Sequence, residues 1–142
     1  MKILNSLKIL GVGAIAVAVL AGCSAPVAKT PGGTVNATLT DMKIALDHGS
    51  VSAGPITFVV KNTGAVAHEL VVLQTDVSQD KIAAGTEEAG KMDETGNVGE
   101  TGDMATGATK TFTVTLAAGH YVLLCNEVGH YGSGMHLAFT VN

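Results

Sequence analysis

Three residues with metal-binding side chains lie in one glycine-rich stretch near the end of the chain. Cys125, His130 and Met135 offer a thiolate, an imidazole and a thioether at the spacing Cys-x4-His-x4-Met. Side chains alternate between the two faces of a strand, so three ligands on an extended run would not converge. A bent loop between two strands can wrap them around one ion. A second imidazole comes from His68, which opens the run HELVVLQ and therefore belongs to a different strand.

Two histidines, a cysteine and a methionine are the ligands of a type 1 copper site, in which a trigonal His2Cys plane carries a long axial thioether. The thiolate binds Cu(I) and shares charge with Cu(II), and imidazole accepts both oxidation states. A geometry between the preferences of the two ions changes little when an electron arrives, which favours fast transfer. Zinc sites use cysteine, histidine and carboxylates rather than methionine. A binuclear copper centre needs a second thiol, which this loop lacks. The ligand set therefore predicts one copper ion per chain, cycling between Cu(I) and Cu(II).

The stretch from Cys125 to Met135 resembles the metal loop of the cupredoxins, and its spacing is similar to that of auracyanin, rusticyanin and sulfocyanin. Residues 62–68 (NTGAVAH) are similar to the stretch that delivers the first histidine ligand in this family, and residues 118–125 (AGHYVLLC) resemble the strand that leads to the cysteine. The resemblance covers residues 34–142. It implies a Greek-key sandwich of seven or eight strands that passes single electrons and catalyses no reaction. Glu69 departs from several relatives, which have Asn after the first histidine.

Seven short runs of β-type sequence can position these ligands. They alternate polar and apolar residues or are rich in β-branched residues, and glycine-containing turns separate them; they cover residues 35–40, 42–46, 55–61, 68–74, 109–116, 120–125 and 135–141. Short strands with regular turn signals and little helical periodicity predict an all-β, antiparallel Greek-key sandwich.

Residues 76–103 interrupt this pattern with a glycine-rich, acidic excursion. It contains eight carboxylates and two lysines, Lys81 and Lys91. We expect a loop insertion in which residues 78–84 form one or two helical turns. Its acidity suits either a solvated loop that aids solubility or a surface that docks a basic partner.

The N-terminal residues predict export. An uncharged run at residues 9–21 is shorter than the roughly 20 apolar residues that span a bilayer, and is typical of a signal peptide. It leads into Leu-Ala-Gly-Cys23, which resembles the cleavage box of bacterial lipoproteins. We expect a signal peptide at 1–22, a lipidated Cys23, a flexible tether at 23–33 and a cupredoxin domain at 34–142, anchored to a bacterial cell membrane and facing the periplasm or the exterior. An ordinary secretory peptide and an uncleaved anchor are the alternatives.

Charge and loop composition indicate the kind of partner. The 142-residue chain has eight lysines, no arginine and a formal net charge of −4, so no basic stripe is available to bind nucleic acid. Small neighbours leave an edge of His130 near the surface, where we expect a redox donor and a redox acceptor to dock on a monomer. His68 should be more enclosed. Asn62 or Asn126 is expected to form a hydrogen bond near the thiolate.

Other classes of protein remain open at this stage. A copper carrier or copper-resistance protein would use exposed methionines and histidines; Met92 lies in the acidic excursion, and Met104 directly follows it. A copper enzyme would need a second metal, but the remaining histidines (His48, His120 and His136) are scattered. A buried structural cysteine and a nucleophilic Cys–His pair would each leave Met135 unexplained.

Overall fold

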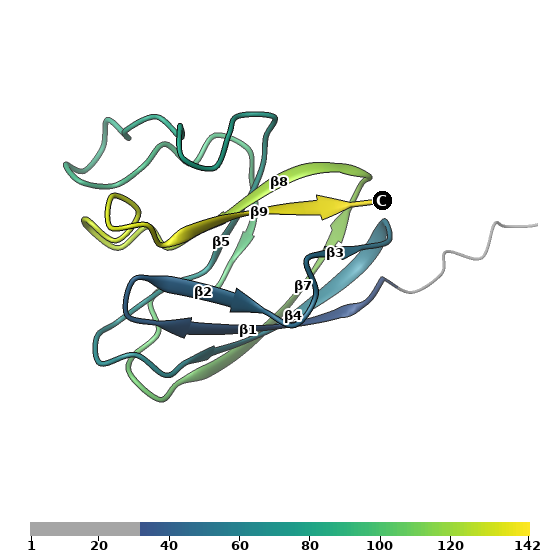
Figure 1. The fold of residues 1–142 in the computed structure, drawn as a ribbon, viewed down its shortest axis with the longest axis horizontal. Helices are drawn as coiled ribbons and strands as arrows, with labels where there is room; N and C mark the ends of the chain where they lie inside the picture. The colour runs from purple at the N-terminus through teal and green to yellow at the C-terminus, as the bar shows by residue number, and fades with distance from the viewer. Residues whose placement is uncertain (1–31) are drawn as a thin grey trace, which may run out of the picture.

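The computed structural model describes residues 32–142, which form two β-sheets packed face to face (Figure 1). The first sheet has the strand order β2-β1-β4-β7, and the second has the order β3-β9-β8-β5-β6. In chain order the strands are β1 (Thr34–Thr40), β2 (Lys43–Leu46), β3 (Ser50–Val51), β4 (Gly54–Asn62), β5 (Val71–Gln74), β6 (Asn97–Glu100), β7 (Thr109–Leu116), β8 (Gly119–Leu124) and β9 (His136–Val141). No helix occurs in this part of the chain, and the prediction of an all-β sandwich is confirmed.

Alternating side chains fill the space between the sheets. In β1 the apolar residues point inward and are buried, whereas threonine and asparagine point outward. Phe58 of β4 stacks on Phe112 of β7 with ring centroids 5.2 Å apart, and it meets Phe139 of β9, in the opposite sheet, at 6.0 Å. Burying an aromatic or large aliphatic side chain stabilises the fold by about 1.5–3 kcal/mol, so these rings join the two sheets.

Two pairings of strands differ from the antiparallel prediction. β1 runs parallel to β4, with Val35 opposite Phe58, and β3 runs parallel to β9. After the β1–β2 hairpin the chain crosses to the second sheet through β3, and it returns as β4 in the same direction as β1. Alternation of polar and apolar residues records which face of a strand is buried, not the direction of its neighbour. The seven expected strands are present, and the two additional ones, β3 and β6, have only two and four residues.

The helical turns predicted for residues 78–84 are absent, and this prediction was wrong. The amide of Lys81 donates to the carbonyl of Ser78 at 2.8 Å, which closes a single turn. The hydroxyl of Tyr131 donates to the carbonyl of Gln79 at 2.7 Å and accepts from the amide of Ile82 at 2.9 Å. In a helix these backbone groups would bond within the segment. A tertiary contact therefore replaces the helical hydrogen bonds.

The acidic excursion packs on the outer face of the second sheet. Ile82 and Met92 cover a small apolar cluster made of Val71, Leu73, Val122, Leu124 and Tyr131. β8 is consequently buried on both faces. In Figure 1 the excursion (teal), the loop after β8 (yellow) and the β1–β2 turn (dark blue) lie at the same end of the sandwich.

The expected signal peptide, the lipidated Cys23 and nearly all of the tether lie outside the described residues. Within residues 32–142, no helix has the length and apolar character needed to cross a bilayer.

Candidate metal centre

The loop between β8 and β9 closes on itself and brings its two ends together. The amide of Cys125 donates to the carbonyl of Met135 at 3.0 Å, and the amide of Met135 donates to the carbonyl of His130 at 3.1 Å. Gly129 and Gly134 have φ values of 81° and 97°, a region that favours glycine. These tight bends place His130 between the two ends of the loop.

His68 comes from the chain between β4 and β5 and is held by a backbone bridge. Its amide donates to the carbonyl of Met104 at 3.1 Å, and the amide of Met104 donates back to its carbonyl at 2.8 Å. Met104 directly follows the acidic excursion and is fully buried. The imidazole of His68 is fully buried as well, as the sequence predicted.

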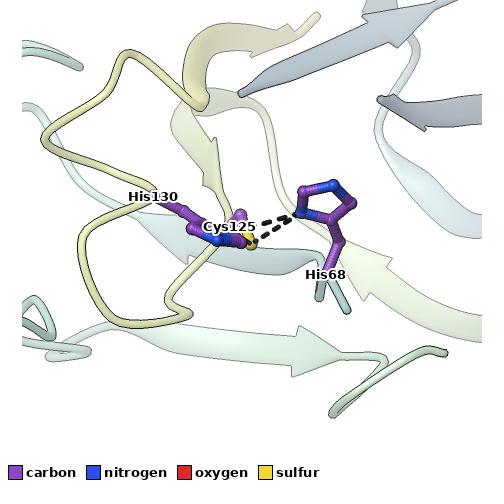
Figure 2. A group of neighbouring side chains, drawn as sticks. All are labelled: His68, Cys125 and His130. Atoms are coloured by element: carbon purple, nitrogen blue, oxygen red, sulfur yellow. Dashed lines mark hydrogen bonds between the residues drawn. The ribbon is translucent and has the colours of Figure 1, made fainter. Parts of the chain in front are cut away.

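The donor atoms of three predicted ligands meet at one point (Figure 2). The Nδ1 atoms of His68 and His130 lie 3.2 Å apart, and they lie 3.9 Å and 3.4 Å from the Sγ atom of Cys125. All three donors fall within 4.8 Å of one another. Donors bound trigonally to one ion, at about 2.0 Å for nitrogen and 2.3 Å for sulfur, would be separated by roughly 3.5 Å. The spacing therefore fits one transition-metal ion.

Met135 completes the predicted set. Its side chain is fully buried and belongs to the same core cluster as Cys125. Its carbonyl accepts the hydrogen bond from the Cys125 amide, so the two residues are adjacent across the neck of the loop. With His68, Cys125 and His130, the residue is arranged as in a copper site.

Burial sets the protonation of the ligands. It raises the pKa of the Cys125 thiol, whereas hydrogen bonds from the backbone amides of Glu69 and Glu127 lower this pKa by a smaller amount. Burial also lowers the pKa of His130, and the neighbouring His68 lowers it further. These shifts favour the thiol form of Cys125 and the neutral form of the His130 imidazole. Because metals bind the thiolate, a metal ion that binds here would displace a proton from Cys125.

A backbone amide reaches the sulfur. The amide of Glu69 donates to Sγ of Cys125 at 3.4 Å. Any residue except proline can supply this backbone donor. The amide hydrogen bond to the sulfur is therefore kept although residue 69 is glutamate here and asparagine in several relatives. The Glu69 side chain is 6% exposed, and burial raises the pKa of its carboxyl to about 7, against the attraction of Lys91.

The two asparagines expected near the thiolate form their hydrogen bonds elsewhere. The side-chain amide of Asn62 donates to the carbonyls of Val66 and Met104, each at 2.8 Å, and so holds the turn that precedes His68. Asn126 accepts from the amide of Met92 at 2.6 Å and donates to the carboxylate of Glu94 at 2.7 Å. Both residues support the site through the backbone of its loops.

The residues that follow two of the ligands attach the metal loop to the acidic excursion. The side chain of Asn126, which follows Cys125, accepts a hydrogen bond from the backbone amide of residue 92. The hydroxyl of Tyr131, which follows His130, bonds the backbone of residues 79 and 82. The amide of Gly129 also donates to the carbonyl of Gly90 at 3.2 Å. No periodicity or spacing in the sequence revealed this attachment. The excursion is therefore a structural support of the metal loop.

The remaining histidines do not join the ligand cluster. His48 and His120 are exposed, and half-buried His136 packs against the ring of Tyr131 with centroids 4.6 Å apart. Tyr121 forms a corner-type bond, because its hydroxyl donates to the carbonyl of Ala117 at 2.9 Å.

Comparison with known proteins supports this reading of the fold. No protein-family model matches the chain, and no curated protein sequence matches it significantly. Among solved structures, dithionite-reduced auracyanin from Roseiflexus castenholzii is 28% identical, with a TM-score of 0.60 over 77% of this chain and 96% of the other. Auracyanin A from Chloroflexus aurantiacus, described as a "blue" copper protein, is 24% identical, with a TM-score of 0.54 over 78% of this chain and all of the other. Rusticyanin from Thiobacillus ferrooxidans is 19% identical, with a TM-score of 0.57 over 77% of each chain.

These solved structures are cupredoxins, and the predicted resemblance is confirmed. The described domain has the cupredoxin fold, and the side chains gathered at one end of its sandwich have the arrangement of a type 1 copper site.

Proposed function

We propose that this protein is a type 1 copper protein that carries single electrons between redox partners, with one copper ion held by His68, Cys125, His130 and Met135. The observation that carries the proposal is the convergence of two imidazole Nδ1 atoms and the Cys125 sulfur within 4.8 Å of one another. The donor set is the one that binds both Cu(I) and Cu(II). When bound, copper supplies the one-electron couple.

The protein's own residues make this couple fast and accessible. His68 and Cys125 are fully buried and His130 is half-buried, so water is kept from most of the site while one imidazole edge faces outward. The backbone bridges at Met104 and Met135 hold the donors close together before any ion arrives. A site that is already assembled reorganises little between the two oxidation states.

The surface around His130 supports docking of a redox partner. Val66, in the turn before His68, and Val128, in the metal loop, are 44% and 53% exposed. Exposed apolar side chains on the two segments that carry the histidine ligands suit brief contacts with a partner protein. We propose that both donor and acceptor dock here.

The burial of the methionines argues against a copper carrier. Such a protein would present exposed thioethers, but Met104 is fully buried, and Met42 and Met92 are half-buried. Met92 packs on the outer apolar cluster and not at the ligand site.

The absorption and paramagnetic-resonance spectra of the copper-loaded protein test the proposal. We expect one copper per chain, an intense visible band from thiolate-to-Cu(II) charge transfer, and reversible one-electron cycling. A colourless protein that binds only Cu(I) would instead identify a carrier. More than one copper per chain would indicate an enzyme.

Substitution of Met135 by leucine tests the axial ligand. The variant should keep copper and its colour, and its reduction potential should rise because a weak donor to Cu(II) is lost. The expected rise is on the order of 60 mV, equivalent to a tenfold change in the ratio of the two affinities. Cyclic voltammetry measures it, with Met92→Leu, outside the site, as the control. An unchanged potential in Met135→Leu would show that the thioether is not a ligand.

We propose that the domain works at a membrane surface, tethered through lipid on Cys23. The sequence Leu-Ala-Gly-Cys23 after a short apolar run supports this, and each buried methylene of an acyl chain adds about 0.8 kcal/mol of anchoring. The variant Cys23→Ala should move the protein from the membrane fraction to the soluble fraction on cell fractionation. Retention of Cys23→Ala in the membrane would point to an uncleaved anchor.

A further inference from the structure

A carboxylate from the first sheet reaches the buried histidine of the metal site. Asp41 lies in the two-residue turn between β1 and β2, where Thr40 pairs with Lys43. Its Oδ1 atom is 3.3 Å from Nε2 of His68 and also accepts a hydrogen bond from the amide of Ala65 at 2.8 Å. The imidazole of His68 is thus held on one side by Asp41, and its other nitrogen faces Cys125 and His130.

The backbone around this contact is shaped to allow it. A Cβ atom on Gly64 would lie 2.5 Å from Oδ1 of Asp41 and 2.7 Å from Nε2 of His68, so the approach requires glycine at position 64. Met42, the other residue of the turn, has a φ of 60°. A non-glycine residue adopts this left-handed conformation at a cost of roughly 1 kcal/mol. The tight turn that needs this conformation directs Asp41 toward the metal site.

The chemistry of imidazole gives the contact a consequence. A neutral imidazole carries one N–H, and an ionised carboxylate only accepts hydrogen bonds. The contact therefore places the proton of His68 on Nε2 and leaves the lone pair of Nδ1 facing the sulfur of Cys125. Carboxylates that hold the outer nitrogen of a metal-binding histidine fix its orientation and increase its basicity.

We propose that Asp41 is a positioning residue that lowers the reduction potential of the copper; this inference rests on the proposed copper site. Its hydrogen bond keeps Nδ1 of His68 available and makes the imidazole a stronger donor. Its negative charge favours Cu(II) over Cu(I), because the ion of higher charge is attracted more strongly. Both effects act in the same direction.

Two substitutions separate the charge from the hydrogen bond. Asp41→Asn keeps a side-chain oxygen that can accept from Ala65 and His68 but removes the charge, and Asp41→Ala removes both. Asp47→Asn is the matched control. It makes the same change in net charge at an exposed residue directly after β2, which bonds Asn36 and His48 rather than a ligand. The full-length, copper-loaded proteins are compared at one pH and one ionic strength.

We expect the ratio of Cu(II) to Cu(I) affinity to fall about tenfold in Asp41→Ala, a rise in potential of about 59 mV. The reduction potential of Asp41→Asn should rise by a smaller amount, and that of Asp47→Asn should equal the wild-type value. In the Cu(I) form, nitrogen-15 NMR should show a slowly exchanging Nε2–H on His68 that is lost in Asp41→Ala. A structural role alone would lower stability and leave the potential unchanged.

The outcomes distinguish the two proposals. Wild-type potentials in both Asp41 variants, with colour and copper retained, would overturn the role of Asp41 and leave the copper site standing. If Asp41→Ala does not fold, the reduction potential of Asp41→Asn alone tests the role of Asp41, because this variant keeps an acceptor for both Ala65 and His68. Absence of a type 1 spectrum in the wild-type protein would overturn the copper site and this inference with it.

Discussion

Replacement of Cys125 by serine is expected to abolish the intense visible absorption of the copper-loaded protein. The band arises from charge transfer between the thiolate and Cu(II), and a hydroxyl is a harder donor that keeps its proton at neutral pH. Sγ of Cys125 lies within 4 Å of both imidazole Nδ1 atoms, and Cys125 is the only cysteine among the described residues, so no other thiolate there can replace it. Copper that still binds through the two histidines should give the weak absorption of an ordinary Cu(II) site.

The same variant should remain folded. Serine is nearly the shape of cysteine, and its hydroxyl can accept the hydrogen bond from the amide of Glu69 that now ends on sulfur. We expect a loss of about 1–2 kcal/mol in the free energy of unfolding, from burying a more polar atom. Circular dichroism and thermal unfolding of the copper-free proteins measure this loss. Ser133→Ala, at an exposed position of the same loop, is the control and should keep the colour. A visible band that persists in Cys125→Ser would show that the thiolate is not a ligand.

The copper-free protein should become less stable as the pH rises from about 4.5 to about 7, and Glu69→Gln should remove this loss. Burial raises the pKa of the Glu69 carboxyl from 4.5 to about 7. The folded state therefore holds a proton that the unfolded state releases, so stability falls as the pH rises through this window. One pKa unit corresponds to about 1.4 kcal/mol, and after allowance for solvent screening we expect about 2 kcal/mol.

The difference between Glu69→Gln and the wild-type protein isolates this effect. His130 acts in the opposite direction, because its pKa is lowered, whereas the lowered pKa values of Asp41, Asp47 and Asp93 act below about pH 4. Urea unfolding at pH 4.5 and pH 8 should show similar stabilities at the lower pH and a more stable Glu69→Gln at the higher one. Glu87→Gln, in the exposed part of the acidic excursion, should follow the wild-type protein. If the free energies of unfolding of Glu69→Gln and the wild-type protein differ by the same amount at both pH values, Glu69 does not hold a proton in the folded state.

The structure of the acidic excursion could be predicted only in part from sequence patterns. Its glycines and carboxylates predicted an exposed insertion, and much of residues 85–90 is exposed. Two of its apolar residues, Ile82 and Met92, are too widely spaced to show a period. They nevertheless cover the second sheet, and residues 79–92 contact the metal loop. The helix expected at residues 78–84 failed for the same reason, since Tyr131 takes the backbone groups that a helix would have used.

The sequence by itself determined which side chains can bind the metal and roughly where the strands lie. Ligand softness belongs to the side chain, and the spacing of Cys125, His130 and Met135 within one loop is a local property. Alternation along each strand is local too, which is why seven strands could be predicted.

Only the tertiary structure decided what surrounds those ligands. The amide of Glu69 on the sulfur, the carboxylate of Asp41 behind His68, and the parallel pairing of β1 with β4 all join segments distant in sequence. Such contacts depend on the register between strands and on the path of the chain between sheets. Because backbone amides and surface carboxylates occur throughout the chain, nothing local distinguishes the few that the fold brings to the metal site.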